Sequence, residues 1–163
     1  MDERDKLLCT LLEENSRIST RDLSEMVDLL EDEVEKRIGE LEKEGIIRKY
    51  ITLIDWEKAG DGGVAAIIEV KVSPERDFGY DKIAERLARF KQVRSLHLIS
   101  GVYDLQMLVT GKTIHEISRF VSEQIAPMDH IRETATTLIM KTYKENGHAF
   151  TEREGGERLP LSF

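Results

Sequence analysis

A short polar segment between two apolar runs, Ser100 to Asp104 in "HLISGVYDLQMLV", holds the first side chains that could do binding chemistry. The gap is too short for a helix, so this segment is predicted to be the turn of a β-hairpin with Gly101 at its bend. Asp104 is a suitable partner for an ammonium group, and backbone N–H groups of the turn could hold a carboxylate. Asp104 and Tyr103 could instead brace the turn, so a structural role stays open.

Three hydroxyl groups further along the chain, in the segment "TATT", could complete such a site. A threonine hydroxyl can donate to a carboxylate, although threonine is also common in strands for packing reasons alone. These hydroxyls belong to Thr134, Thr136 and Thr137.

A second surface that could bind a ligand lies on a helix predicted over residues 31–44. There Lys36 and Arg37 form a basic pair that follows an acidic first turn and could contact nucleic acid. Residues 19–45 hold four Lys and Arg against ten Asp and Glu, and unpaired acids repel DNA phosphates. The acids could form a solvated helix face that suits the helix dipole. They could also accept hydrogen bonds from cytosine N4 and so reject wrong DNA sites.

The first 60 residues are predicted to form a winged helix-turn-helix domain. Apolar residues at helical spacing indicate helices over about 2–14, 20–27 and 31–44, and "IIRKYITLI" (46–54) alternates like two short strands of a wing. Leu23, Met26 and Val27 are expected to face inward. This pattern normally places its third helix in the DNA major groove, although trihelical domains also serve as protein-interaction modules.

Residues 61–163 are predicted to form a ferredoxin-like βαββαβ sandwich, which makes the whole chain α+β. The expected strands cover 64–72, 93–99, 104–110 and 131–140, and the expected helices cover 80–90 and 113–126. Both helices must pack on one face of the sheet. The other face, with Ala65 and Ile67, is too apolar for water, so we expect a homodimer with its sheets face to face or edge to edge. A polar tail over 141–163 ends in "LPLSF", which could dock on a neighbouring subunit.

Composition narrows the class of protein. The chain has 163 residues with a net charge of −8, and 34% of them are charged. It lacks an apolar run long enough for a membrane helix, and its charged start does not resemble a signal peptide. The lone Cys9 fits a reducing cytoplasm. The four histidines form no close pair, and we find no catalytic set, so we expect no metal, no cofactor and no enzyme activity.

Three segments together carry a family resemblance: "RISTRDLSEMVDLLEDEVEKRIGELEKEGIIRKY", "SGVYDL" and "TATTLIMK". Over about residues 1–145 the chain resembles the Lrp/AsnC family of transcription regulators. The resemblance implies a DNA-binding winged helix and a ferredoxin-like domain that dimerises, forms larger even-numbered oligomers and binds amino acids or related metabolites at the hairpin. Four residues of the hairpin match the family's effector motif, and three threonines are expected to add hydroxyl groups: Ser100, Gly101, Tyr103, Asp104, Thr134, Thr136 and Thr137. The chain departs from the family pattern with Leu30 at the cap position and with Gly39 and Glu40 where basic residues are common.

The sequence therefore predicts a transcription regulator of double-stranded DNA, controlled by a small metabolite such as an amino acid. The residues expected at the DNA are Thr20, Arg21, Asp32, Glu33, Lys36, Arg37 and Glu40. One alternative is a metabolite sensor or assembly protein whose acidic head no longer binds DNA. Another is an enzyme resembling haem-pathway decarboxylases. A tetrapyrrole carries many carboxylates, so its pocket would need many Arg and His residues. The second and fourth predicted strands contain only Arg94, His97 and Arg132.

Overall fold

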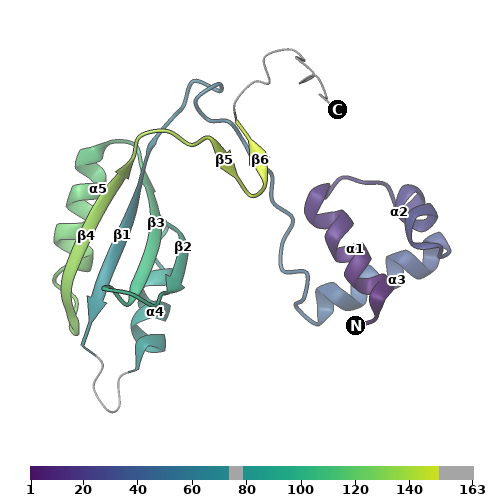
Figure 1. Cartoon of the computed structure of the whole chain (residues 1–163), viewed down its shortest axis with the longest axis horizontal. Coiled ribbons are helices and arrows are strands. Elements are labelled where there is room, and N and C mark those ends of the chain that lie inside the picture. Colours follow the sequence, from purple (N-terminus) through teal and green to yellow (C-terminus); the bar gives the residue numbers. More distant parts are fainter. Residues whose placement is uncertain (74–78, 151–163) are drawn as a thin grey trace, which may run out of the picture. The chain divides into compact units, whose positions relative to one another are not determined.

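A computed structural model describes residues 1–73 and 79–150 of the chain. The chain forms two compact units, Met1–Ile54 and Asp55–Phe163, and each is described by itself below (Figure 1). The first unit is helical, and the second is built on an antiparallel sheet. None of the helices in the described part of the chain is long and apolar enough to cross a membrane.

The first unit contains the three predicted helices, α1 (Glu3–Glu14), α2 (Thr20–Val27) and α3 (Glu31–Lys43). Asp2 and Asp5 form a reciprocal capping box at the start of α1, and the Ser19 hydroxyl accepts from the N–H of Asp22 at the start of α2. Helix α3 begins after Leu30, which has no capping side chain. Acidic residues in its first turn complement the helix dipole instead.

The core of this unit is small and comes from one face of each helix. Leu8, Leu23, Val27 and Val34 form one buried cluster, and Leu41 on α3 is also buried. The prediction that Met26 faces inward is wrong, because its side chain is 57% exposed. At 100° per residue, Leu23 and Val27 share the buried stripe, and Met26 lies on the other side of Leu23 from Val27.

The two short strands predicted over residues 46–54 do not form. Residues 46–54 follow Gly45, which ends α3 with a φ of 71°, and they form no strand. A tight hairpin needs residues such as Asn-Gly at its bend, and "IIRKYITLI" offers none between its two halves. The segment therefore has strand-like alternation without a turn that could fold it back on itself.

The second unit has the predicted ferredoxin-like order. It consists of β1 (Val64–Val72), α4 (Tyr80–Ala88), β2 (Val93–Leu98), β3 (Leu105–Gly111), α5 (Ile114–Phe120) and β4 (Ile131–Ile139). The sheet order is β2-β3-β1-β4, and all its pairs are antiparallel. Strand β1 is central, so β3 and β4, which carry or adjoin the predicted site, lie on either side of it (Figure 1).

Alternation along β1 separates the two faces of the sheet, as predicted. Ala66, Ile68, Val70 and Val72 are buried in one cluster with the apolar residues of α4 and α5. Their neighbours point to the opposite face, which no helix of this unit covers within the described residues. Register places Ala65, Ile67, Leu108, Ala135 and Ile139 together there.

Two details of this unit were not predicted. The second predicted helix, 113–126, is α5 followed by a π-helical turn, η1 (Val121–Ile125), and its first residue, Ile114, is 53% exposed. The tail begins with a small hairpin of β5 (Lys144–Glu145) and β6 (His148–Ala149). The "LPLSF" segment lies outside the described residues.

Candidate functional site

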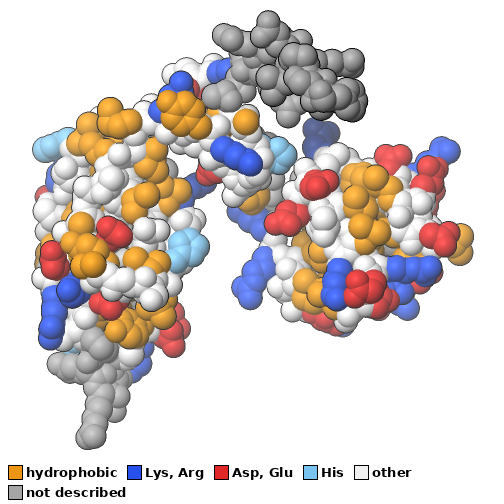
Figure 2. Space-filling view, in the orientation of Figure 1, with side chains coloured by type: hydrophobic (Ala, Val, Ile, Leu, Met, Phe, Trp, Pro, Cys, Tyr) orange, Lys and Arg blue, Asp and Glu red, His pale blue; other side chains and the backbone are white. Residues whose placement is uncertain are grey.

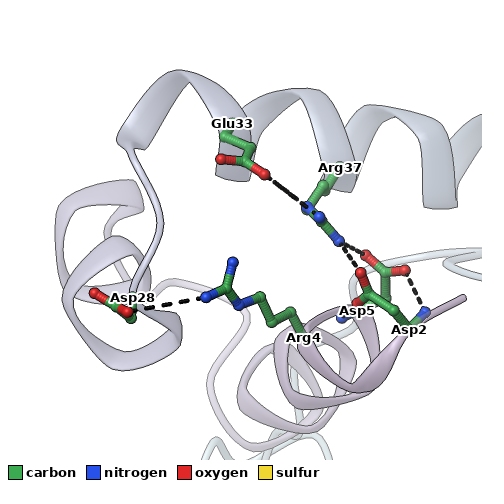
Figure 3. A network of polar contacts seen from close by, with 6 residues as sticks. All are labelled: Asp2, Arg4, Asp5, Asp28, Glu33 and Arg37. Atoms are coloured by element: carbon green, nitrogen blue, oxygen red, sulfur yellow. Dashed lines mark hydrogen bonds and ion pairs between the residues drawn. The ribbon is translucent and has the colours of Figure 1, made fainter.

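The basic pair on α3 has two different environments. Arg37 is held by three carboxylates, as Figure 3 shows: its Nη1 donates to Asp2 at 2.7 Å and to Asp5 at 2.8 Å, and its Nη2 lies 3.3 Å from Glu33. Its side chain is only 23% exposed. Lys36 is exposed and has no ion-pair partner among the residues that the structure describes.

Each of the two carboxylates at the start of α1, Asp2 at the N-cap and Asp5 in the first turn, serves both the helix cap and Arg37. Asp2 accepts from the Asp5 N–H through one oxygen and from Arg37 through the other, and Asp5 mirrors this arrangement. The hydrogen bond from Arg37 is the main reason that the pKa of Asp2 falls from 3.8 to about 2. Hydrogen bonds to Asp2 and Asp5 likewise raise the pKa of Arg37, so the contact is between charged groups.

The other residues predicted to contact DNA lie on the surface of this unit. Thr20 begins α2, Arg21 pairs with Glu25 at 3.5 Å, and Asp32, Glu33 and Glu40 are exposed on α3. A small hollow of about 230 Å³ is lined by Asp5, Glu33, Lys36, Arg37 and Glu40. Acidic and basic side chains are interspersed on the face of this unit seen in Figure 2, where no basic patch gathers.

Three further cations near the end of α3 were not among the predicted residues. Lys43 lies in the last turn of α3, and Arg48 and Lys49 follow it in the segment predicted to be a wing. All three are exposed. A signal for them is present in the sequence, because "RK" in "IIRKY" is a basic pair in an otherwise acidic unit, but the alternation of that segment predicted only a strand.

In the second unit, the predicted hairpin joins β2 to β3. The Ile99 N–H donates to the Asp104 carbonyl at 2.8 Å, and the Asp104 N–H donates to Val70 on β1 at 3.1 Å. The Asp104 carboxylate accepts from the Val72 N–H at 2.8 Å and from the Tyr80 hydroxyl at 3.4 Å. The register of β1 with β4 shifts between Lys71 and Val72, so Asp104 supplies an acceptor beside an irregular part of the strand.

These contacts describe the bracing role that the sequence left open for Asp104, and they occupy both of its carboxylate oxygens. Tyr103 donates to Glu133 at 3.2 Å, and burial, followed by this hydrogen bond, raises the pKa of Tyr103. Ser100 and Gly101 are exposed. Gly101 does not have a positive φ, and a Cβ there would meet nothing within 4 Å.

The structure does not bring the three predicted threonines together. Thr134 pairs with Val70 and Thr136 with Ile68, so both lie on the helix side of the sheet. Thr137 pairs with Ile67 on the opposite face. Successive side chains of a strand alternate between faces, so Thr136 and Thr137 cannot hold one carboxylate between them.

A shallow groove beside the hairpin was not predicted, since it joins residues far apart in the sequence. Its volume is about 400 Å³, and it lies between α4 and the strand ends that flank the turn. Leu96, Leu98 and Leu105 give it an apolar side, and Asp81 and Glu85 add carboxylates. Tyr80, which contacts Asp104, also lines it. An apolar groove with acidic groups suits a small cationic or zwitterionic molecule.

Metal ligands do not gather in the described part of the chain: no group of three or more His, Cys, Asp and Glu side chains there could hold an ion. The three carboxylates around Arg37 are satisfied by its guanidinium. Burial raises the pKa of the Cys9 thiol, which disfavours the reactive thiolate.

A trihelical unit with an exposed helix surface, joined to a ferredoxin-like unit with a groove, defines a two-domain protein of the helix-turn-helix and ligand-binding class. Residues 1–48 match the model of a winged helix-turn-helix DNA-binding domain, and residues 65–149 match that of the Lrp/AsnC ligand binding domain. The chain belongs to the Lrp/AsnC family of transcription regulators.

Relatives and solved structures agree with this assignment. The chain is 38% identical to YugG of Bacillus subtilis (strain 168), an uncharacterised HTH-type transcriptional regulator, over 98% of this chain and 97% of YugG. It is similar to the crystal structure of PH0061, with a TM-score of 0.76, 27% identity and coverage of 89% and 96%. It shares the fold of the regulator NMB0573 of Neisseria meningitidis, solved as a complex with L-Met, with a TM-score of 0.71, 24% identity and coverage of 92% and 94%.

Proposed function

We propose that this protein binds specific double-stranded DNA through its helical unit and is controlled by a small metabolite, such as an amino acid, bound to its sheet unit. The observation that carries the proposal is that one chain joins a helix-turn-helix unit to a ligand-binding unit of one regulator family. Its curated relatives are named as transcription regulators, so we propose regulation in the cytoplasm and no enzyme activity.

The helical unit supports weak general affinity for DNA. Lys36 is exposed and unpaired among the described residues, but acids crowd α3 and the net charge of the chain is −8. Phosphate neutralisation supplies most non-specific affinity. Several heads acting together would offset this weakness, because linked sites raise the effective concentration of the second contact.

The apolar outer face of the sheet supports an assembly with several heads. Ile67 lies between Leu108 and Thr137 in the register, and Ala65 lies beside Ile139. Contiguous apolar side chains on one face of a sheet are stabilised when a second copy covers them. We propose a homodimer through this face, which assembles into a larger even-numbered oligomer.

The groove beside the hairpin is the effector site in this proposal, together with Ser100, Gly101, Tyr103 and Asp104. Its acidic side chains, Asp81 and Glu85, suit an ammonium group, and its leucines suit an apolar side chain. Thr134 and Thr136 lie on one face of the sheet and Thr137 lies on the other. One bound effector can therefore contact either Thr134 and Thr136 or Thr137.

The test is a gel shift with the DNA upstream of the protein's own gene, with and without each of the twenty amino acids. Methionine belongs in the panel because NMB0573 was solved as an L-Met complex. The proposal expects a retarded band whose affinity changes with at least one amino acid. A shift that no amino acid alters would contradict the effector class.

A second candidate function has a specific observation in its favour. Arg37, one of the two central cations of α3, is already engaged by Asp2, Asp5 and Glu33. A protein of this kind could sense a metabolite and assemble without binding DNA. It would bind an amino acid in calorimetry yet fail to shift any duplex, even at low salt.

A further inference from the structure

Helix α3 carries three basic side chains, and their surroundings differ. Arg37 lies at the edge of the face that packs on α1, and Lys36 and Lys43 lie on the exposed side. A separation of seven residues is about two turns, so these two lysines follow one stripe of the helix. Gly39 lies between them, and a Cβ there would meet nothing within 4 Å.

The guanidinium of Arg37 has little left to offer a base or phosphate. Its Nη1 donates to both Asp2 and Asp5, while Nε and Nη2 each donate to Glu33. These bonds use four of the five donors of an arginine. A bidentate contact to guanine needs two donors side by side, so Arg37 would have to release at least one carboxylate first.

The carboxylates also change the field that DNA would meet at this point. Three carboxylates surround the guanidinium of Arg37, and each of them lies within hydrogen-bonding distance of it. A phosphate that approaches Arg37 is therefore repelled by the excess of acid. Lys36 and Lys43 have no ion-pair partner in the part of the chain that the structure describes, so their charges are available.

We propose that α3 divides its cations between two tasks: Arg37 is a positioning residue that holds α3 on α1, and Lys36 and Lys43, on either side of Gly39, form the stripe that contacts DNA. This inference rests on the proposed DNA-binding function. The absence of a side chain at Gly39 lets the helix backbone approach the duplex between the two lysines.

The experiment measures the affinity of the full-length protein for a fluorescein-labelled duplex of random sequence at several salt concentrations. The logarithm of the binding constant falls with the logarithm of salt, with a slope of about 0.9 for each phosphate that the protein neutralises. Lys36→Gln and Lys43→Gln should each reduce this slope by about that amount, at unchanged melting temperature. Lys91→Gln, which removes an exposed lysine from the sheet unit, is the matched control.

Arg37→Gln should instead lower the melting temperature of the helical unit and keep the salt slope, and Arg37→Lys, which keeps the charge, should recover part of the loss. Asp2→Asn should also lower the melting temperature, because it removes one charged partner of Arg37, and it should change DNA affinity only as much as the loss of one negative charge does. Glu14→Gln, on the same helix, controls for the loss of one negative charge. A purely structural role for Arg37 predicts no gain in affinity for Asp2→Asn beyond that control.

The inference is overturned if Arg37→Gln reduces the salt slope as much as Lys36→Gln without any change in melting temperature. It is also overturned if both lysine variants keep the wild-type slope. If the wild-type protein binds neither this duplex nor its own upstream DNA, the proposed function is wrong, and so is the lysine stripe. The melting temperatures of the Arg37 and Asp2 variants then still decide whether Arg37 holds α3 on α1.

Discussion

At the scale of single residues, two charged side chains that were predicted to contact DNA or an effector contact other residues of the protein instead. Arg37 contacts Asp2 and Asp5 at the start of α1, and Asp104, in the turn before β3, accepts from the backbone N–H of Val72 on β1. The sequence shows that a charged residue is present, but it does not show which residue, far away along the chain, its side chain contacts. The residue types of both candidate surfaces could therefore be predicted, while their partners depended on the packing of separate elements.

Substitutions at Asp104 separate its bracing role from a role in binding. Asp104→Ala leaves the N–H of the buried Val72 without its acceptor, which should cost about 1–3 kcal/mol of stability. Asp104→Asn keeps an acceptor oxygen and removes the charge, so the fold should survive. Hydrogen exchange at the Val72 amide measures the first effect, and calorimetry with amino acids measures the second.

If Asp104 binds the ammonium group of an effector, Asp104→Asn should weaken the binding free energy of the effector by about 2 kcal/mol, which is typical of a hydrogen bond to a charged group. Tyr80→Phe, which removes only the second contact to Asp104, is the control for indirect effects. Equal effector binding by wild type and Asp104→Asn, with reduced Val72 protection in Asp104→Ala, would leave Asp104 with the bracing role alone.

The contact between Arg37 and Asp2 predicts a pH dependence of stability. The pKa of Asp2 is lowered from 3.8 to about 2 in the folded chain, so its contribution is complete above about pH 5 and is lost as the pH falls from about 4 through 2. Asp2→Asn keeps a good helix cap but lacks this charge. The stability difference between wild type and Asp2→Asn, followed by thermal unfolding, should therefore shrink over that range. A difference that stays constant from pH 6 to pH 2 would contradict the charge pair.

At the scale of elements, Gly39 is the feature of α3 that packing does not explain. An exposed glycine inside a helix costs about 1 kcal/mol relative to alanine, and a methyl group added there would have no neighbour within 4 Å. Gly39→Ala should therefore raise the stability of the helical unit by about that amount. It should at the same time weaken DNA binding, because the added methyl group lies between Lys36 and Lys43. Unfolding and anisotropy measurements on this variant check both effects, and unchanged affinity would mean that another face of the helix approaches DNA.

Elements with a strong apolar period were predictable, and those that depend on turns or on irregular hydrogen bonding were not. The alternation of β1 and the helical spacing of α1 and α3 follow from one-sided burial, which leaves a clear trace in the sequence. The two strands predicted over residues 46–54 do not form, because alternation alone does not supply the turn that would pair them. The π-helical turn η1 keeps apolar residues on the core side, so its sequence resembles an ordinary helix.

At the scale of the whole molecule, the outer face of the sheet predicts the assembly. Ile67→Asp places a charge between Leu108 and Thr137, where a second copy is proposed to pack. Because Ile67 points away from the buried cluster of its own unit, the fold should survive and light scattering should report a monomer. Ile114→Asp, a matched change at an exposed position on the helix side, should keep the wild-type size. A wild-type protein that is monomeric at micromolar concentration would contradict the assembly.

The central claim, that this acidic protein is a sequence-specific DNA regulator, is tested most directly by comparing two affinities under one condition. Fluorescence anisotropy at physiological salt would measure the dissociation constant for the DNA upstream of the protein's own gene and for a scrambled duplex of the same composition. Specific recognition predicts a ratio of about 10³ or more in favour of the upstream DNA. Equal affinities, or no binding to either duplex, would contradict the claim and favour a metabolite sensor that does not bind DNA.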